Sequence, residues 1–315
     1  MERKGKTLTM SVFARRKQQG RKIVLLTAYD LTSALIAAAG GVDAILVGDS
    51  VGMVVLGYEN TLPVTVDDLL HHCQAVSRAR PRVPVIADMP YGSFHVSPAE
   101  TVRHGLRLVK EGGASAVKIE GGRNRAEVIK ALLAAEIPVM GHLGLTPQSV
   151  NRFGGYKVQG RGEKAAAALL EEALFLQEIG CFGLVLECVP SPLAEKISSR
   201  LSIPTIGIGA GPGCDGQVLV FHDMLGLFTG LKPKFVKRYA ELGTAAVQAV
   251  EQFSGEVRDG AFPGPEHEYG AEPSRGPKNS AGAEAKGSGN GSGANVSGQS
   301  GYLGNLESNP EADGD

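Results

Sequence analysis

Residues 116–120 read Ala-Val-Lys-Ile-Glu, a short apolar run that ends in a carboxylate. Because side chains alternate along a strand, Lys118 and Glu120 share one face, while Val117 and Ile119 take the other. Similar runs alternate with helical patterns along the chain, which is typical of a parallel α/β sheet. The predicted strands are Ile23–Ala28, Ala44–Gly48, Val85–Asp88, Ala116–Glu120, Val139–Gly141, Gly183–Glu187, Thr205–Ile208 and Gln217–Val220.

The helices between these runs have readable ends. Asp30 can cap a helix that stops at Gly40–Gly41, and Ser97–Glu100 has the pattern of a capping box with Pro in the first turn. Eight strands at this spacing within residues 1–256 favour a closed (β/α)₈ barrel, or TIM barrel, over the competing doubly wound open sheet. Lys234–Phe253 is apolar at helical spacing, which predicts a final packed helix.

The composition changes sharply near residue 257. Residues 257–315 consist mostly of Gly, Ser, Asn, Ala, Pro and Glu. Such a segment cannot bury enough apolar area to offset its ordering entropy. We therefore predict a catalytic barrel domain over 1–256 and a low-complexity, disordered C-terminal tail over 257–315.

Charge and hydropathy exclude several classes of partner. The formal net charge is -1 and the pI is about 6.7, which gives no general attraction to nucleic acid or to anionic membrane. No apolar run approaches the roughly 18 residues of a membrane span, and the basic N-terminus lacks the apolar stretch of a secretory signal. The four cysteines have no C-x-x-C spacing and are expected to be reduced thiols, so we predict a cytoplasmic protein.

Four of the predicted strands end in a carboxylate or are directly followed by one: Asp49, Asp88, Glu120 and Glu187. In a barrel these strand ends meet on one face, where catalytic groups gather. Converging carboxylates repel one another unless a cation lies among them, and hard oxygen ligands suit Mg²⁺. The alternative for each Asp is that it caps the following helix or starts a turn.

Glu187 differs from the other three because Leu186, Cys188 and Val189 flank it. A carboxylate in apolar surroundings tends to have a raised pKa, which suits a general base or acid. Its alternative is a buried ion pair with Lys or Arg. His142, after the fifth strand, either hydrogen-bonds a substrate or bonds a neighbouring loop. His71-His72 is interpreted as structural or interfacial, because adjacent helical residues cannot face one metal.

The glycine-rich segment Gly207–Gly216 contains a match to G-x-G-x-x-G. No first βα turn precedes the match, and a strand rather than a helix follows it, so the pattern does not indicate a dinucleotide site. The alternative is a loop after the seventh strand that lies over the active face.

Six motifs in series, within about 8–255, resemble the ketopantoate hydroxymethyltransferase family. They are Leu26–Asp30, Val47–Met53, Asp88–Phe94, Val117–Gly122, Gly141–Gln148 and Gly207–Gly211. The resemblance implies a (β/α)₈ barrel that assembles as a homodecamer. It also implies Mg²⁺-dependent transfer of a hydroxymethyl group from 5,10-methylenetetrahydrofolate to 3-methyl-2-oxobutanoate, which yields ketopantoate and tetrahydrofolate in pantothenate biosynthesis.

The resemblance also implies roles for the strand-end residues. Asp49, Asp88 and Glu120 would serve the magnesium site. The 2-oxo acid would be bound by Asp49, Ser50, Asp88 and Lys118, and Glu187 would be the catalytic proton acceptor. Two alternatives stay open: a Mg²⁺-dependent lyase or phosphonomutase of the phosphoenolpyruvate/isocitrate lyase type, whose K-x-C-G-H motif is absent here, and a catalytically silent barrel kept for assembly.

Overall fold

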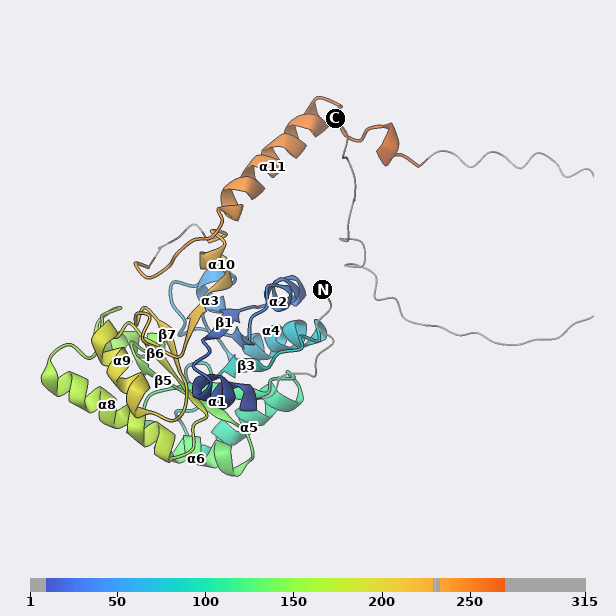
Figure 1. Ribbon diagram of the computed structural model, residues 1–315. Helices are drawn as coiled ribbons and strands as arrows, with labels where there is room; N and C mark the ends of the chain where they lie inside the picture. The colour runs from blue at the N-terminus through green and yellow to red at the C-terminus, as the bar shows by residue number, and fades with distance from the viewer. Residues whose placement is uncertain (1–9, 229, 231–232, 270–315) are drawn as a thin grey trace, which may run out of the picture. The chain divides into compact units, whose positions relative to one another are not determined.

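Eight parallel strands close into a barrel in the computed structural model, which describes residues 10–228, 230 and 233–269 (Figure 1). Each strand pairs with its neighbours in chain order, and β8 pairs with β1. The strands are β1 Ile23–Thr27, β2 Ala44–Val47, β3 Val85–Asp88, β4 Ala116–Glu120, β5 Val139–Gly144, β6 Gly183–Glu187, β7 Thr205–Ile208 and β8 Gly216–Leu219. The closed barrel is therefore confirmed over the open sheet.

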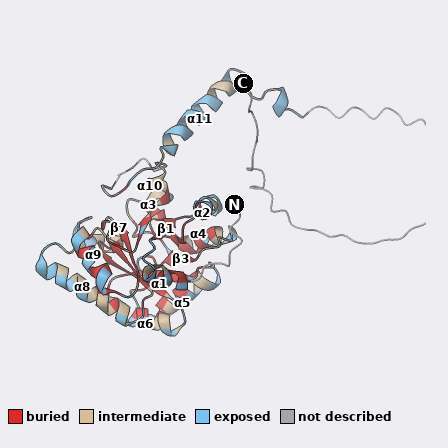
Figure 2. Cartoon of the chain, in the orientation of Figure 1, coloured by how far each residue is buried: buried red, intermediate tan, exposed pale blue. Residues whose placement is uncertain are grey.

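Helices in the βα connections cover the outside of the strands, so the strands are the buried centre in Figure 2. The longer ones are α2 Leu31–Ala39, α4 Val66–Arg78, α5 Pro98–Lys110, α6 Ala126–Ala134, α8 Glu163–Glu178 and α9 Ser191–Arg200. Short helices follow some strands: α3 Val51–Val54, α7 Val150–Phe153 and α10 Phe221–Met224. No helix in the described ranges has the length and apolarity needed to cross a membrane.

Two features confirm local predictions. The Asp30 carboxylate accepts the Ser33 N–H, and Ser97 Oγ accepts the Glu100 N–H, so both residues cap helices as expected. Among the described residues, no return hydrogen bond from Glu100 completes the predicted capping box at Ser97. A feature that was not predicted is α1, Ser11–Gln18. Its fully buried Phe13 clusters with the inward-facing side chains of the barrel strands and lies 5.5 Å from the Phe182 ring. This helix thereby adds to the barrel core.

The end of the chain differs from the predicted packed helix over Lys234–Phe253. Helix α11 spans Leu242–Arg258 and begins only after the turns of 233–241. None of its residues is buried, so the prediction that its apolar face packs is wrong for this chain. A unit boundary follows Phe262, so the predicted domain limit after 256 falls inside α11. Most of the predicted tail, 257–315, lies outside the described residues.

The turn after β5 depends on a glycine. Gly144 has φ +94°, and a Cβ at this position would overlap the Glu187 carbonyl oxygen. We expect Gly144→Ala to lower the free energy of unfolding by on the order of 2–5 kcal/mol, from backbone strain plus overlap. Urea unfolding followed by circular dichroism would measure this loss.

Gly41→Ala is the matched control for that experiment. Gly41 has a similar φ of +82°, but nothing lies within 4 Å of an added Cβ. This variant should therefore lose only the strain component, about 1–2 kcal/mol. Equal losses in the two variants would show that the contact with Glu187 does not matter.

Candidate active site

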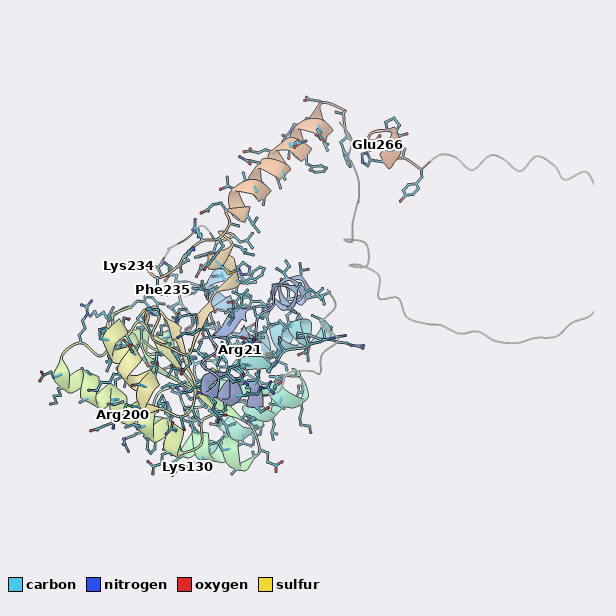
Figure 3. All side chains as sticks on the ribbon, in the orientation of Figure 1. Arg21, Lys130, Arg200, Lys234, Phe235 and Glu266 are labelled. Atoms are coloured by element: carbon cyan, nitrogen blue, oxygen red, sulfur yellow. The ribbon has the colours of Figure 1, made fainter. Side chains whose placement is uncertain are left out.

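A cavity of about 670 Å³ opens at the carboxyl ends of the strands. Its lining includes every predicted site residue: Asp49, Ser50, Asp88, Lys118, Glu120 and Glu187. Lys234 and Phe235, labelled in Figure 3, line it from the segment that follows α10. The strand-end positions read from the sequence therefore converge on one pocket, as the barrel topology requires.

A buried ion pair lies at the centre of this cavity. Lys118 Nζ is 2.8 Å from Asp88 Oδ1, and the side chains of both residues are almost fully buried. Burial alone would lower the pKa of Lys118, but the carboxylates of Asp88, Glu120 and Asp49 outweigh burial and raise it. Lys118 is therefore a permanent cation among the carboxylates.

Neither Asp49 nor Asp88 caps a following helix. Asp88 Oδ2 accepts the Asp49 N–H at 3.0 Å, and Asp49 Oδ2 accepts from Gln148 Nε2 at 2.8 Å. Both carboxylates are instead used to connect separate loops at the mouth of the barrel. This geometry removes the helix-cap alternative for these two residues.

Acidic side chains outnumber basic ones in the lining of the pocket. Burial, together with the nearby Asp88 and Glu120 charges, raises the pKa of Asp49 well above its ordinary value. Burial likewise raises the pKa of Glu120 to about 8, although Lys118 opposes the shift. Glu120 Oε1 is buried without a hydrogen-bond partner. A further cation would relieve both the repulsion and this unpaired oxygen.

These residues fit a magnesium ion in part. Across the described residues, no group of three or more His, Cys, Asp or Glu side chains is arranged to hold a metal ion. A preassembled site of Asp49, Asp88 and Glu120 is therefore not seen. Mg²⁺ commonly takes only one or two carboxylates and fills its other positions with water and substrate. The unpaired Glu120 oxygen suits that role, and the assignment of ligands stays a prediction.

His142 lies within β5, directly opposite Glu120, rather than after the strand as predicted. Its Nδ1 is 3.2 Å from Lys118 Nζ. An ammonium group can only donate, so Nδ1 accepts and Nε2 carries the proton. Nε2 lies 3.3 Å from Glu187 Oε2, a close contact rather than a well-formed hydrogen bond. Burial and the Lys118 charge lower the pKa of His142, so it is neutral.

Glu187 has the environment that its apolar neighbours predicted. Burial raises its pKa, and the contact with His142 only partly offsets this effect. Among the described residues, no Lys or Arg forms an ion pair with Glu187. The ion-pair alternative therefore fails, and Glu187 is a carboxylate of raised pKa that faces the cavity.

Two residues of the site were not assigned roles from the sequence. Gln148 Nε2 donates to Asp49 Oδ2 and to the Met89 carbonyl, while its N–H donates to Glu120 Oε2. Tyr29 Oη lies 2.8 Å from Ser50 Oγ, and burial raises the pKa of Tyr29, so the phenol stays protonated. Both residues lie in motifs quoted above, but no local pattern predicts these long-range contacts.

The remaining motifs behave as expected. His72 Nδ1 bonds the Tyr29 carbonyl at 2.6 Å, which is a structural contact. Gly209 and Gly211 line the cavity, and strand β8 rather than a helix follows their loop. The glycine-rich segment therefore lacks the strand–turn–helix context of a dinucleotide site.

Solved structures share the fold at low sequence identity. A phosphoenolpyruvate phosphomutase from Streptomyces platensis subsp. rosaceus is 16% identical with a TM-score of 0.53, and the match covers 80% of this chain and 88% of that chain. A 2,3-dimethylmalate lyase of the PEP mutase/isocitrate lyase superfamily is 19% identical with a TM-score of 0.53, covering 84% and 89%. These likenesses concern the barrel architecture alone.

Sequence similarity separates the families that share this barrel. Residues 7–265 match the family model for ketopantoate hydroxymethyltransferase, so the match continues past 257, where the family pattern was predicted to end. Two proteins named 3-methyl-2-oxobutanoate hydroxymethyltransferase, from Syntrophus aciditrophicus and Trichlorobacter lovleyi, are 54% and 55% identical. Each alignment covers 84% of this chain, and 98% and 99% of the respective relative. This chain therefore belongs to the ketopantoate hydroxymethyltransferase family.

Proposed function

We propose that this chain catalyses the Mg²⁺-dependent transfer of a hydroxymethyl group from 5,10-methylenetetrahydrofolate to 3-methyl-2-oxobutanoate, giving ketopantoate and tetrahydrofolate in pantothenate biosynthesis. Family membership supports the reaction class. The observation that carries the proposal is the position of Glu187. This carboxylate of raised pKa lines the same cavity as the Lys118–Asp88 ion pair.

The 2-oxo acid needs positive charge and hydrogen-bond donors. Lys118 offsets negative charge near the bound acid, and Ser50 hydrogen-bonds its carboxylate while Tyr29 holds the Ser50 hydroxyl. Asp49 and Asp88, with Glu120 beside them, would hold Mg²⁺. When bound there, the ion would supply a Lewis acid that polarises the ketone and stabilises negative charge on its oxygen.

Glu187 removes the proton from C3 of the bound 2-oxo acid. Neutral His142, held by Lys118 on its other nitrogen, lies in close contact with the Glu187 carboxylate and restricts its movement. The enolate carbon then forms a bond to the methylene carbon of the folate, whose ring has opened to an iminium ion. Water then attacks this methylene carbon, so that the new C–O bond forms as the bond between the carbon and the folate nitrogen breaks. The proton taken up by Glu187 and one proton of the water end on the two folate nitrogens, and ketopantoate and tetrahydrofolate leave.

Proton NMR in D₂O tests the proposal in two stages. The protein is first incubated with 3-methyl-2-oxobutanoate and Mg²⁺, and 5,10-methylenetetrahydrofolate is then added. We expect loss of the C3 proton signal before the folate is added, and ketopantoate afterwards. Exchange without ketopantoate would favour a lyase-type enolate enzyme, and neither change would favour a silent barrel.

Removal of magnesium should abolish both stages. After chelation and desalting, we expect C3 exchange to fall by at least about 10²-fold, because enolate formation loses its charge stabilisation. Added Mg²⁺ should restore it, and circular dichroism before and after treatment controls for unfolding. Undiminished exchange in protein shown to be metal-free would contradict the magnesium requirement.

Assembly and location remain expectations of the same proposal. We expect a homodecamer, which sedimentation velocity would test, and a cytoplasmic location. All four cysteines are free, and Cys73, Cys181 and Cys214 are buried. This state agrees with a reducing compartment.

A further inference from the structure

A second cavity of about 240 Å³ lies beside the first and shares Glu120 with it. Three loops build it, which follow β3, β4 and β5. Besides Glu120, Gln148 and Ser149, the polar side chains that line it are Tyr91, His95, Asn124, Arg125, Asn151 and Arg152. No role in the proposed reaction uses any of these six residues.

Basic side chains outnumber acidic ones in this cavity, since Arg125 and Arg152 face one acid, Glu120. Among the ion pairs of the described residues, none involves Arg125 or Arg152, whereas Arg123 in the same turn pairs with Glu172. Arg125 Nε is buried without a hydrogen-bond partner. The Arg125 guanidinium lies 5.2 Å from the Phe94 ring centroid and that of Arg152 lies 4.8 Å from Phe153. Aromatic faces thus support both cations and leave their N–H edges for a ligand.

The neutral groups around these arginines supply further donors. His95 Nδ1 accepts the Gly92 N–H at 3.2 Å, so Nε2 carries the ring proton. Burial and the Arg125 charge lower the pKa of His95 to about 4, so the ring is neutral at physiological pH. Glu120, the one acid of the cavity wall among the described residues, already accepts from the Gln148 N–H.

We propose that this second cavity binds a carboxylate or phosphate group through Arg125 and Arg152. Both arginines present planar sets of N–H donors that match such anions. The cavity is smaller than the roughly 300 Å³ at which pockets for whole ligands begin, so it receives one anionic group. That group belongs either to a free anion or, if the proposed function holds, to the glutamate tail of the folate in the neighbouring cavity.

Titration with inorganic phosphate tests the site directly. Isothermal calorimetry on the full chain compares the wild type with Arg125→Gln and Arg152→Gln. We expect each substitution to weaken binding about ten- to hundredfold, through the loss of a charge-assisted hydrogen bond. Arg123→Gln, which removes the same charge from the same turn but outside the cavity, should bind like the wild type. Equal affinity in all four proteins, or no binding to the wild type, would overturn the proposal.

Two folate donors then identify the source of the anion. One is 5,10-methylenetetrahydrofolate, and the other is the same donor without its glutamate. If the tail occupies the site, the wild type shows a higher KM for the shortened donor, and Arg125→Gln raises the KM for the full donor to that value with kcat retained. If a free anion occupies it, the two donors behave alike in every variant. Absence of transfer with either donor would contradict the proposed function, while the phosphate titration still decides the anion site.

Discussion

Glu187→Gln lowers the rate of C3 proton exchange in 3-methyl-2-oxobutanoate by about 10²- to 10⁴-fold, the usual contribution of a general base. The substitution preserves the size of the side chain and its place at the end of β6. An amide cannot accept the C3 proton, and among the described residues no other carboxylate contacts His142 Nε2. Exchange measured by proton NMR in D₂O isolates this step, because it requires no folate.

Binding of the 2-oxo acid should survive the same substitution. Lys118 and Ser50 remain in place, so the dissociation constant measured by calorimetry should change less than threefold, on the order of 0.6 kcal/mol. Glu178→Gln, on the exposed face of α8, is the matched control and should retain full exchange. Wild-type exchange in Glu187→Gln would remove Glu187 from the role of base, and lost binding would make it a binding residue instead.

The strand-end carboxylates could be predicted from the sequence because topology fixes them. Any residue that ends a parallel barrel strand lies on the same face of the barrel. The positions of Asp88, Glu120 and Glu187 could therefore be predicted without knowing their contacts. The predicted strands β3, β4, β6 and β7 have the bounds that the structure shows. Local pattern and global topology agree for these elements.

The fifth strand shows where local pattern fails. The predicted strand ends at Gly141, whereas β5 continues to Gly144, and glycines at both positions weaken the local strand propensity. Pairing with both neighbours extends it, as Glu120 lies opposite His142 and Glu187 opposite Gly144. Tertiary pairing, which one sequence does not display, thus placed His142 inside the strand and into the pocket.

Contacts between residues far apart in the sequence could not be predicted either. Gln148 bonds Asp49, which lies 99 residues earlier, and nothing in the surrounding loop marks its amide for that role. For α11, a contact was predicted that the structure does not show, because none of its residues is buried. Its spacing predicted the helix, but periodicity cannot say whether another surface covers it.

Lys118→Met should destabilise the chain by about 3–5 kcal/mol at pH 7, because it removes the cation from a buried group of carboxylates. Methionine fills nearly the same volume, so the loss reflects charge rather than a cavity. Lys130→Met, an exposed change on α6 labelled in Figure 3, is the matched control and should alter stability by no more than about 0.5 kcal/mol. Urea unfolding compares the two variants with the wild type.

The pH dependence of this loss separates charge from packing. Burial raises the folded-state pKa of Asp49 and Glu120, so their ionised forms oppose folding at neutral pH. Without Lys118 that opposition grows. It disappears below the unfolded-state pKa of about 4, where both acids are protonated in either state. The gap between Lys118→Met and the wild type should therefore narrow as pH falls from 8 to 4, because Asp49 and Glu120 then lose the negative charge that Lys118 offsets. A gap of constant size across this range would mean that the Lys118 stem, and not its charge, supports the site.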